Sequence, residues 1–103
     1  MQREYYVYVI ELKQLTFSKD VYVGSSAFSP ELRFKKHLEG DRASRHVRNR
    51  GIRLLPEYYE NLNPCFSRRD AKRKELYIRR KLEKRGFRVY GSCTKLENKT
   101  CRL

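Results

Sequence analysis

The chain has 103 residues, enough for one domain with a single hydrophobic core and too few for a second. Its 25 Lys and Arg residues outnumber 12 Asp and Glu residues, and the formal net charge of +13 is typical of proteins that bind polyanions, either nucleic acid or an anionic membrane surface. No apolar run approaches the roughly 20 residues that a transmembrane helix needs, so we expect no such helix in this sequence.

The three cysteines, Cys65, Cys93 and Cys101, are widely spaced and odd in number. Zinc sites usually pair their ligands as CxxC or HxxxH, and neither spacing occurs in the sequence. The first residues also lack the apolar segment of a signal peptide. We therefore expect reduced thiols and an intracellular protein, in the cytoplasm or the nucleoid.

The first quarter of the sequence predicts a β-hairpin. Residues 5–12 and residues 21–25 are dense in aromatic and β-branched side chains, which favour strands. The connection, residues 13–19, is short enough for the two strands to pair antiparallel. Both faces of the first strand are largely apolar or aromatic, so we expect it in the middle of the sheet with cover on each side.

A helix is predicted after the hairpin. Ser29 is a favourable N-cap, Pro30 suits the first helical position, and Glu31 complements the dipole in the first turn. We expect the helix to run to about Leu38 and to stop at Gly40.

The rest of the sequence predicts two more strands and a second helix. In order, we expect an irregular basic segment over 41–51, a third strand over 52–62 with Pro56 at an edge or a bend, a helix from the N-cap Ser67 to about Arg85, and a last short strand over 87–90. The predicted fold is α+β, a small, mainly antiparallel sheet in the order β-β-α-β-α-β with helices packed on it. We expect one domain over residues 1–92 and a polar C-terminal tail over residues 93–103.

The second predicted helix carries an acidic residue on its apolar face. Ala71, Ile78 and Leu82 form a stripe spaced for burial, and Glu75 completes that stripe. Glu75 is either a chance polar residue at the margin of the stripe or a group that faces something inside a cleft. An uncompensated carboxylate on a buried face is costly, but the helical pattern alone leaves both interpretations open.

The hairpin also places polar aromatic groups together. Tyr8 and Tyr22 fall on faces that antiparallel pairing can bring to the same surface. Gly24, two residues after Tyr22, leaves space beside the strand for a ligand or another backbone. Tyrosines are common in strands and this chain has eight, so the tyrosines alone do not indicate a site.

The first helix carries Arg33 and His37 at i and i+4, so the two side chains project from one face. The neighbouring apolar pair, Phe34 and Leu38, is expected to anchor this helix to the sheet. A solvated Arg-His pair is the ordinary outcome for a single helix, and this pair gains meaning only beside the other polar positions.

Taken in order, these positions resemble the GIY-YIG nuclease superfamily. The matching positions are Tyr6-Val7-Tyr8, Tyr22-Val23-Gly24, Arg33, His37, and the pair Ala71 and Glu75. The resemblance covers about residues 5–91 and points to the small stand-alone members and to the nuclease subunit of structure-specific resolvases. It implies a GIY-YIG-like nuclease domain.

The resemblance implies a metal-dependent endonuclease that hydrolyses DNA phosphodiester bonds. Five catalytic residues are implied: Tyr8, Tyr22, Arg33, His37 and Glu75. Tyr8 would be the general base, Arg33 would bind the scissile phosphate, and Glu75 would hold one Mg²⁺ or Mn²⁺ ion. Tyr22 and His37 would orient water and substrate. An ion in the cleft would explain why Glu75 points inward.

A run of arginines precedes the third strand and is expected to grip DNA phosphates. The expected nucleic-acid-binding residues are Gly24, Arg42, Arg45, His46, Arg48, Arg50, Arg53 and Lys72. Phosphate contacts position DNA without reading its bases. We therefore expect selectivity for DNA structure in place of sequence, a role in repair or recombination, and a protein partner that supplies targeting, with no membrane partner.

Two other interpretations compete with the endonuclease. The first is a non-catalytic nucleic-acid-binding module of the same fold within a larger assembly. The second is a basic ribosome-associated domain, which would leave the inward Glu75 unexplained. The complete set of five implied catalytic residues favours the endonuclease, since a binding module has no need for all of them.

Overall fold

The computed structural model describes residues 4–14, 19–40 and 45–91. In chain order the elements are β1 (Tyr6–Leu12), β2 (Lys19–Ser26), α1 (Pro30–Glu39), α2 (Arg45–Arg50), β3 (Gly51–Leu54), the 3₁₀ turns η1 (Pro56–Tyr58) and η2 (Glu60–Leu62), α3 (Arg68–Lys84) and β4 (Phe87–Gly91). The fold is α+β, as the sequence predicts. The expected polar tail, residues 93–103, lies outside the described residues.

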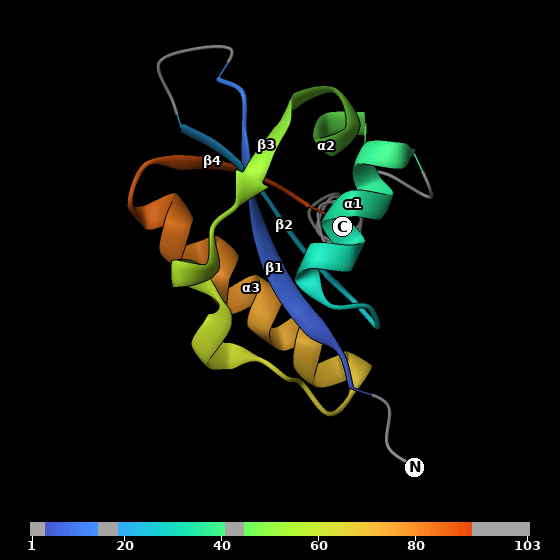
Figure 1. The fold of residues 1–103 in the computed structure, drawn as a ribbon. Coiled ribbons are helices and arrows are strands. Elements are labelled where there is room, and N and C mark those ends of the chain that lie inside the picture. Colours follow the sequence, from blue (N-terminus) through green and yellow to red (C-terminus); the bar gives the residue numbers. More distant parts are fainter. Residues whose placement is uncertain (1–3, 15–18, 41–44, 92–103) are drawn as a thin grey trace, which may run out of the picture.

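The four strands form one sheet in the order β3-β1-β2-β4. β1 pairs antiparallel with both β2 and β3, and β4 pairs parallel with β2. Figure 1 shows α1 and α2 on one side of the sheet and α3 on the other. The prediction of a central first strand is confirmed, because β1 lies between β3 and β2 and its residues 7–10 are all buried. The third strand lies at an edge of the sheet, as predicted, because β1 is its only neighbour in the sheet of the described residues. The sheet is mainly antiparallel, with one parallel ladder.

The third strand is shorter than predicted. β3 ends at Leu54, and the chain then makes two 3₁₀ turns where the sequence predicted extended backbone up to residue 62. The physical reason is Pro56, which has no N–H for a ladder and occupies the first position of η1. Its carbonyl oxygen accepts a hydrogen bond from the Tyr59 N–H at 3.0 Å, which closes the turn.

The basic segment before β3 contains a helix that the sequence analysis missed. Residues 45–50 form α2, although an irregular segment was predicted. Val47 is the only described apolar side chain in this helix and is fully buried. A single apolar residue among arginines gives no periodic signal, so the tertiary contact decides the structure here.

The two long helices begin as predicted. The Ser29 hydroxyl accepts a hydrogen bond from the Leu32 N–H, and the Ser67 hydroxyl accepts one from the Asp70 N–H at 3.0 Å. Gly40 ends α1 in the left-handed conformation, with φ of 89°. The sequence therefore predicted the caps correctly.

The buried face of α1 differs from the prediction. Leu38 was expected to anchor the helix, but it is 47% exposed. Its neighbour His37 is 1% exposed and faces the sheet in its place, while Phe34 is partly buried against the core. Arg33 and His37 are therefore not the solvated pair that is ordinary for a single helix. His37 is buried beside an aromatic partner on β1, and Arg33 is partly buried.

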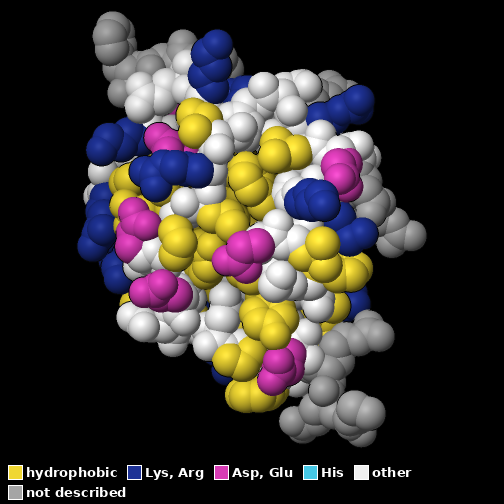
Figure 2. Space-filling model, viewed as in Figure 1, with side chains coloured by type: hydrophobic (Ala, Val, Ile, Leu, Met, Phe, Trp, Pro, Cys, Tyr) yellow, Lys and Arg dark blue, Asp and Glu magenta, His cyan; other side chains and the backbone are white. Residues whose placement is uncertain are grey.

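Charge is unevenly spread over the surface. In the face shown in Figure 2, hydrophobic and acidic side chains occupy the middle, and Lys and Arg side chains lie mostly at the margins. This face therefore lacks the concentrated positive charge that a polyanion-binding surface needs. Among the described residues, no helix combines the length and apolar character required to cross a membrane.

Candidate active site

Three rings form a buried cluster between the sheet and α1. In the β1–β2 register Tyr8 lies opposite Gly24, and Tyr22 is two residues before Gly24 on β2. The Tyr8 and Tyr22 rings are stacked with centroids 6.3 Å apart, and the His37 ring meets both edge-on at 5.9 and 5.5 Å. The Tyr8 hydroxyl oxygen is 3.0 Å from His37 Nε2, a buried hydrogen bond. The hairpin and the first helix thus meet at the polar groups predicted from their spacing.

Gly24 provides the space that the Tyr8 ring occupies. A β-carbon at position 24 would lie 2.7 Å from the Tyr8 hydroxyl oxygen and 3.0 Å from a ring carbon of Tyr22. The sequence analysis expected this space to admit a ligand or a backbone. It is taken up by the phenol of Tyr8, so Gly24 acts on the site by positioning that side chain.

Burial controls the protonation of the two hydrogen-bonded groups. Burial raises the pKa of Tyr8 well above its ordinary value of 10, and Tyr22 and Glu75 raise it further, while the charge of Arg33 and a hydrogen bond from it lower the pKa. Burial, with the nearby Arg33, lowers the pKa of His37 from 6.5 to about 4. At neutral pH the site therefore contains a phenol hydrogen-bonded to a neutral imidazole.

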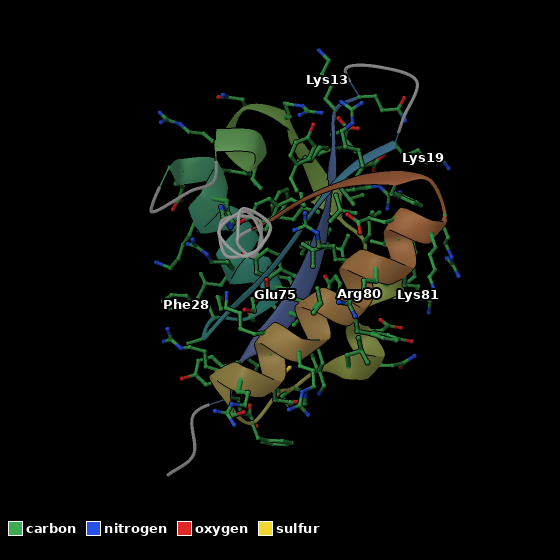
Figure 3. The ribbon with its side chains drawn as sticks, turned by 180° about the vertical axis from the view of Figure 1, so that it is seen from behind. Lys13, Lys19, Phe28, Glu75, Arg80 and Lys81 are labelled. Carbon is green, nitrogen blue, oxygen red and sulfur yellow. The ribbon has the colours of Figure 1, made fainter. Side chains whose placement is uncertain are left out.

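Glu75 reaches the same region from the opposite side of the sheet. It lies on the inner stripe of α3 with Ala71, Ile78 and Leu82 and is 1% exposed. Its carboxylate accepts a hydrogen bond from the Ser25 hydroxyl, and Lys72 Nζ lies 3.4 Å from the same oxygen, Oε2. Figure 3 shows Glu75 between α3 and the start of α1, where Phe28 lies, and far from Lys13 and Lys19 at the other end of the sheet.

Tyr8 and Glu75 approach this end of β2 from opposite faces of the sheet. The last β2–β4 pair is Val23 with Gly91, so Gly24 and Ser25 lie beyond the end of that ladder within the described residues. Ser25 follows Val21 and Val23 in strand phase and faces α3, while Tyr22 and Gly24 face α1. A carboxylate held by Ser25 is therefore close enough to raise the pKa of Tyr8.

A model of the GIY-YIG catalytic domain matches residues 4–97 of the chain. The chain belongs to the GIY-YIG family. Membership implies nuclease activity in general, with DNA as the substrate. No curated protein and no solved structure matched the chain.

Glu75 is an acidic side chain beside the buried cluster that suits a divalent cation. Among the described residues, no group of three or more His, Cys, Asp or Glu side chains could form a metal cage. Mg²⁺ commonly binds through one or two carboxylates and completes its shell with waters and substrate phosphate. Glu75 fits that pattern, because its carboxylate already attracts the cation of Lys72 and is oriented by a hydroxyl.

The arginines predicted to bind DNA have different environments. Arg42 lies outside the described residues, and Arg45 and His46 lie in α2. Arg48 is exposed in the last turn of that helix. Arg53 is exposed and pairs with Glu11 at 2.8 Å.

Arg50 has a structural position. Its side chain is 12% exposed, forms an ion pair with the buried Asp20, and donates two hydrogen bonds to the Lys13 carbonyl at 2.7 and 3.0 Å. The guanidinium also lies 5.4 Å from the centroid of the Tyr90 ring. Arg50 thus joins α2 to β1, β2 and β4, and it is not presented to a phosphate as the sequence analysis expected.

Ser25, which holds the Glu75 carboxylate, was not predicted from the sequence. The signal was available, because Ser25 occupies the strand phase of Val21 and Val23, where an apolar side chain is expected. Ser25 is polar at an apolar position of β2, and Glu75 is polar at an apolar position of α3. The hydrogen bond between them accounts for both, and neither the strand pattern nor the helix pattern predicts it alone.

Proposed function

We propose that this GIY-YIG domain is a metal-dependent DNA endonuclease that hydrolyses phosphodiester bonds. The observation that carries the proposal is the convergence of Tyr8, His37, Arg33 and Glu75. Tyr8 is hydrogen-bonded to His37, and both Arg33 and Glu75 are close enough to change the pKa of its phenol. A domain that only bound DNA would gain nothing from burying these groups together.

Tyr8 and His37 are suited to act as a proton relay. Since burial raises the pKa of Tyr8, a free phenolate is disfavoured and a direct role as an ionised base is costly. The neutral His37 can accept the phenol proton through Nε2 while the phenol oxygen takes a proton from the attacking water. The water oxygen forms the new bond to phosphorus as the bond between phosphorus and the leaving oxygen breaks. The leaving oxygen takes a proton from solvent, and His37 later releases its proton to solvent.

Arg33 completes the charge balance of this relay. It lies near both Tyr8 and His37, and its charge lowers the pKa of both groups. A phosphate bound by the planar guanidinium would offset that charge and make protonation of His37 less costly. Tyr22, stacked on Tyr8, keeps the phenol in place.

Glu75 would hold one Mg²⁺ or Mn²⁺ ion, oriented by the Ser25 hydroxyl. A divalent ion at a nuclease site neutralises charge on the phosphate and on the leaving oxygen. The arginines that remain exposed, Arg48 and Arg53, would contact the DNA backbone together with Lys72. These contacts carry no base information, so we propose selectivity for DNA structure, with a partner protein supplying targeting.

The test is a cleavage assay on duplex, flapped and four-way DNA with Mg²⁺ or Mn²⁺. We expect metal-dependent cleavage by the wild type, and loss of at least about 10²-fold with Tyr8→Phe or Glu75→Gln while DNA binding is retained. Glu57→Gln, an exposed carboxylate on η1, is the matched control and should cleave normally.

The alternative is a non-catalytic nucleic-acid-binding module of the same fold within a larger assembly. It predicts binding to these DNAs and no cleavage of any of them by the wild-type protein with either metal. Normal cleavage by Glu75→Gln would instead contradict the assigned metal ligand.

A further inference from the structure

A small hollow lies beside Glu75 at the start of α3. Its volume is about 150 Å³, and it is lined by Tyr5, Ser25, Ser26, Ala27, Arg68 and Lys72. Arg68 and Lys72 are one helical turn apart and enter from the same side. Two of the lining side chains are cationic and none is acidic, and the volume is large enough for one phosphate group.

Two cationic side chains, Arg68 and Lys72, line this hollow, and Lys72 is shared with Glu75. The Ser25 hydroxyl donates to Glu75, and the Ser26 hydroxyl donates to the Phe28 carbonyl at 3.0 Å, so neither proton is free. Arg68 lies over the ring of Tyr5, 5.8 Å from its centroid, which limits the positions its guanidinium can take. An arginine held in this way presents a planar pair of N–H groups, a geometry that phosphate oxygens match.

Lys72 connects the hollow to the catalytic carboxylate. Its ammonium lies 3.4 Å from Glu75 Oε2, yet its side chain is 39% exposed and also lines the hollow. An anion in the hollow would therefore attract Lys72 away from the carboxylate. Neither Arg33 nor Tyr8, which the proposed function assigns to the scissile phosphate, lines the hollow, so a ligand here would lie next to that phosphate without being it.

We infer that this hollow is a subsite for a non-scissile phosphate of the DNA substrate. The inference rests on the proposed function for the location of the scissile bond, and it adds Arg68 and Tyr5 to the residues that contact or support DNA. The subsite would fix the substrate strand relative to Glu75 through backbone contact alone, so it would operate on any sequence.

The experiment measures DNA binding in Ca²⁺ or EDTA, so that it does not depend on cleavage. Fluorescence anisotropy with flapped DNA at several salt concentrations gives the slope of log K against log salt. Arg68→Ala should weaken binding about five- to tenfold and reduce that slope by about one, since one phosphate contact is lost. Arg69→Ala, an exposed neighbour that does not line the hollow, should change neither quantity.

A neutral methylphosphonate placed singly at each position around the branch locates the contact. One position should weaken wild-type binding and have no further effect on Arg68→Ala. An unchanged salt slope for Arg68→Ala, or equal sensitivity of wild type and variant at every position, would overturn the subsite. A wild type that binds with this pattern and never cleaves would overturn the proposed function and leave the subsite intact.

Inorganic phosphate separates a DNA subsite from a pocket for a free anion. Titrated alone and followed by NMR, it should bind weakly, because a single phosphate lacks the neighbouring contacts of the strand. Binding at sub-millimolar phosphate that Arg68→Ala abolishes, together with an unchanged DNA salt slope, would assign the hollow to a free anion and overturn the inference.

Discussion

The phenol of Tyr8 lies against Gly24, so that a β-carbon at position 24 would be 2.7 Å from the hydroxyl oxygen and 2.8 Å from the ring carbon that bears it. The ring has no room to retreat, because it is buried and bounded by Tyr22 and His37. Gly24→Ala should therefore displace the phenol, break its hydrogen bond to His37 and lower the free energy of unfolding by about 1–3 kcal/mol. Urea denaturation and the cleavage assay measure the two effects.

The double variant Tyr8→Phe/Gly24→Ala is the control. Removing the hydroxyl relieves the closest contact, so the second substitution should cost less stability in the Tyr8→Phe background than in the wild type. Additive effects in this cycle would show that Gly24 acts on stability by a route other than the Tyr8 phenol.

Arg50 and its neighbour Arg48 should respond differently to substitution. Arg50→Ala leaves the carboxylate of Asp20 buried without its cation, and breaking a buried ion pair in this way costs about 3–5 kcal/mol. Arg48→Ala removes an exposed side chain and should change the free energy of unfolding by less than about 0.5 kcal/mol. Thermal or urea unfolding of the two variants decides the comparison.

DNA binding by the same two variants tests whether Arg50 contacts phosphate. If Arg50 were a phosphate ligand, Arg50→Ala would weaken DNA binding while the protein stayed as stable as the wild type. The geometry predicts that Arg50→Ala lowers the free energy of unfolding and that Arg48→Ala weakens DNA binding.

The sequence predicts the site where a residue conflicts with its own local pattern. Glu75 on an apolar stripe is such a conflict, and the buried pair of Glu75 and Ser25 resolves it. The i, i+4 spacing of Arg33 and His37 also correctly placed both side chains on one face of α1. Which face of that helix would be buried was not predictable, because it depends on the hydrogen bond between Tyr8 and His37 across 29 residues.

In the basic segment before β3, the roles of the arginines could not be predicted from the sequence. Local sequence cannot separate an arginine that binds phosphate from one that joins secondary structures, because both sit in the same charged run. Arg50 differs from Arg48 only in what the fold places near it, the buried Asp20 and the ring of Tyr90. For the same reason α2, whose single buried apolar residue is Val47, could not be predicted.

Lys72 should compete with a divalent cation for Glu75. Its ammonium lies 3.4 Å from the carboxylate, and both cannot neutralise the same oxygen. Lys72→Met should therefore strengthen Mn²⁺ binding in the absence of DNA by about two- to fivefold, the equivalent of one partly exposed ion pair. Mn²⁺ titration monitored by electron paramagnetic resonance measures this directly.

The control for this measurement is Lys74→Met, which removes a lysine of the same helix that pairs with Asp70. It should leave Mn²⁺ affinity unchanged, and Lys72→Met/Glu75→Gln should lose the gain. Equal Mn²⁺ affinity of the wild type and Lys72→Met would show that Lys72 does not restrict the carboxylate.

His37 should make the stability of the fold depend on pH. Its pKa is about 4 in the folded protein and near 6.5 when the chain is unfolded, because burial and Arg33 disfavour the charged imidazole. Between these two values the unfolded chain binds a proton at His37 that the folded protein does not. The contribution of His37 to the free energy of unfolding should therefore be complete above pH 6.5. As the pH decreases to 4, the free energy of unfolding should fall by roughly 1–3 kcal/mol.

His37→Gln isolates this contribution from the carboxylates that titrate in the same range. Glutamine keeps a polar group near the Tyr8 hydroxyl and cannot be protonated, so the loss of stability between pH 7 and pH 4.5 should be smaller in the variant than in the wild type. Urea denaturation at four pH values gives both slopes. Parallel slopes would mean that His37 carries the same proton in the folded and unfolded states, and the relay proposed for Tyr8 and His37 would then lose its neutral acceptor.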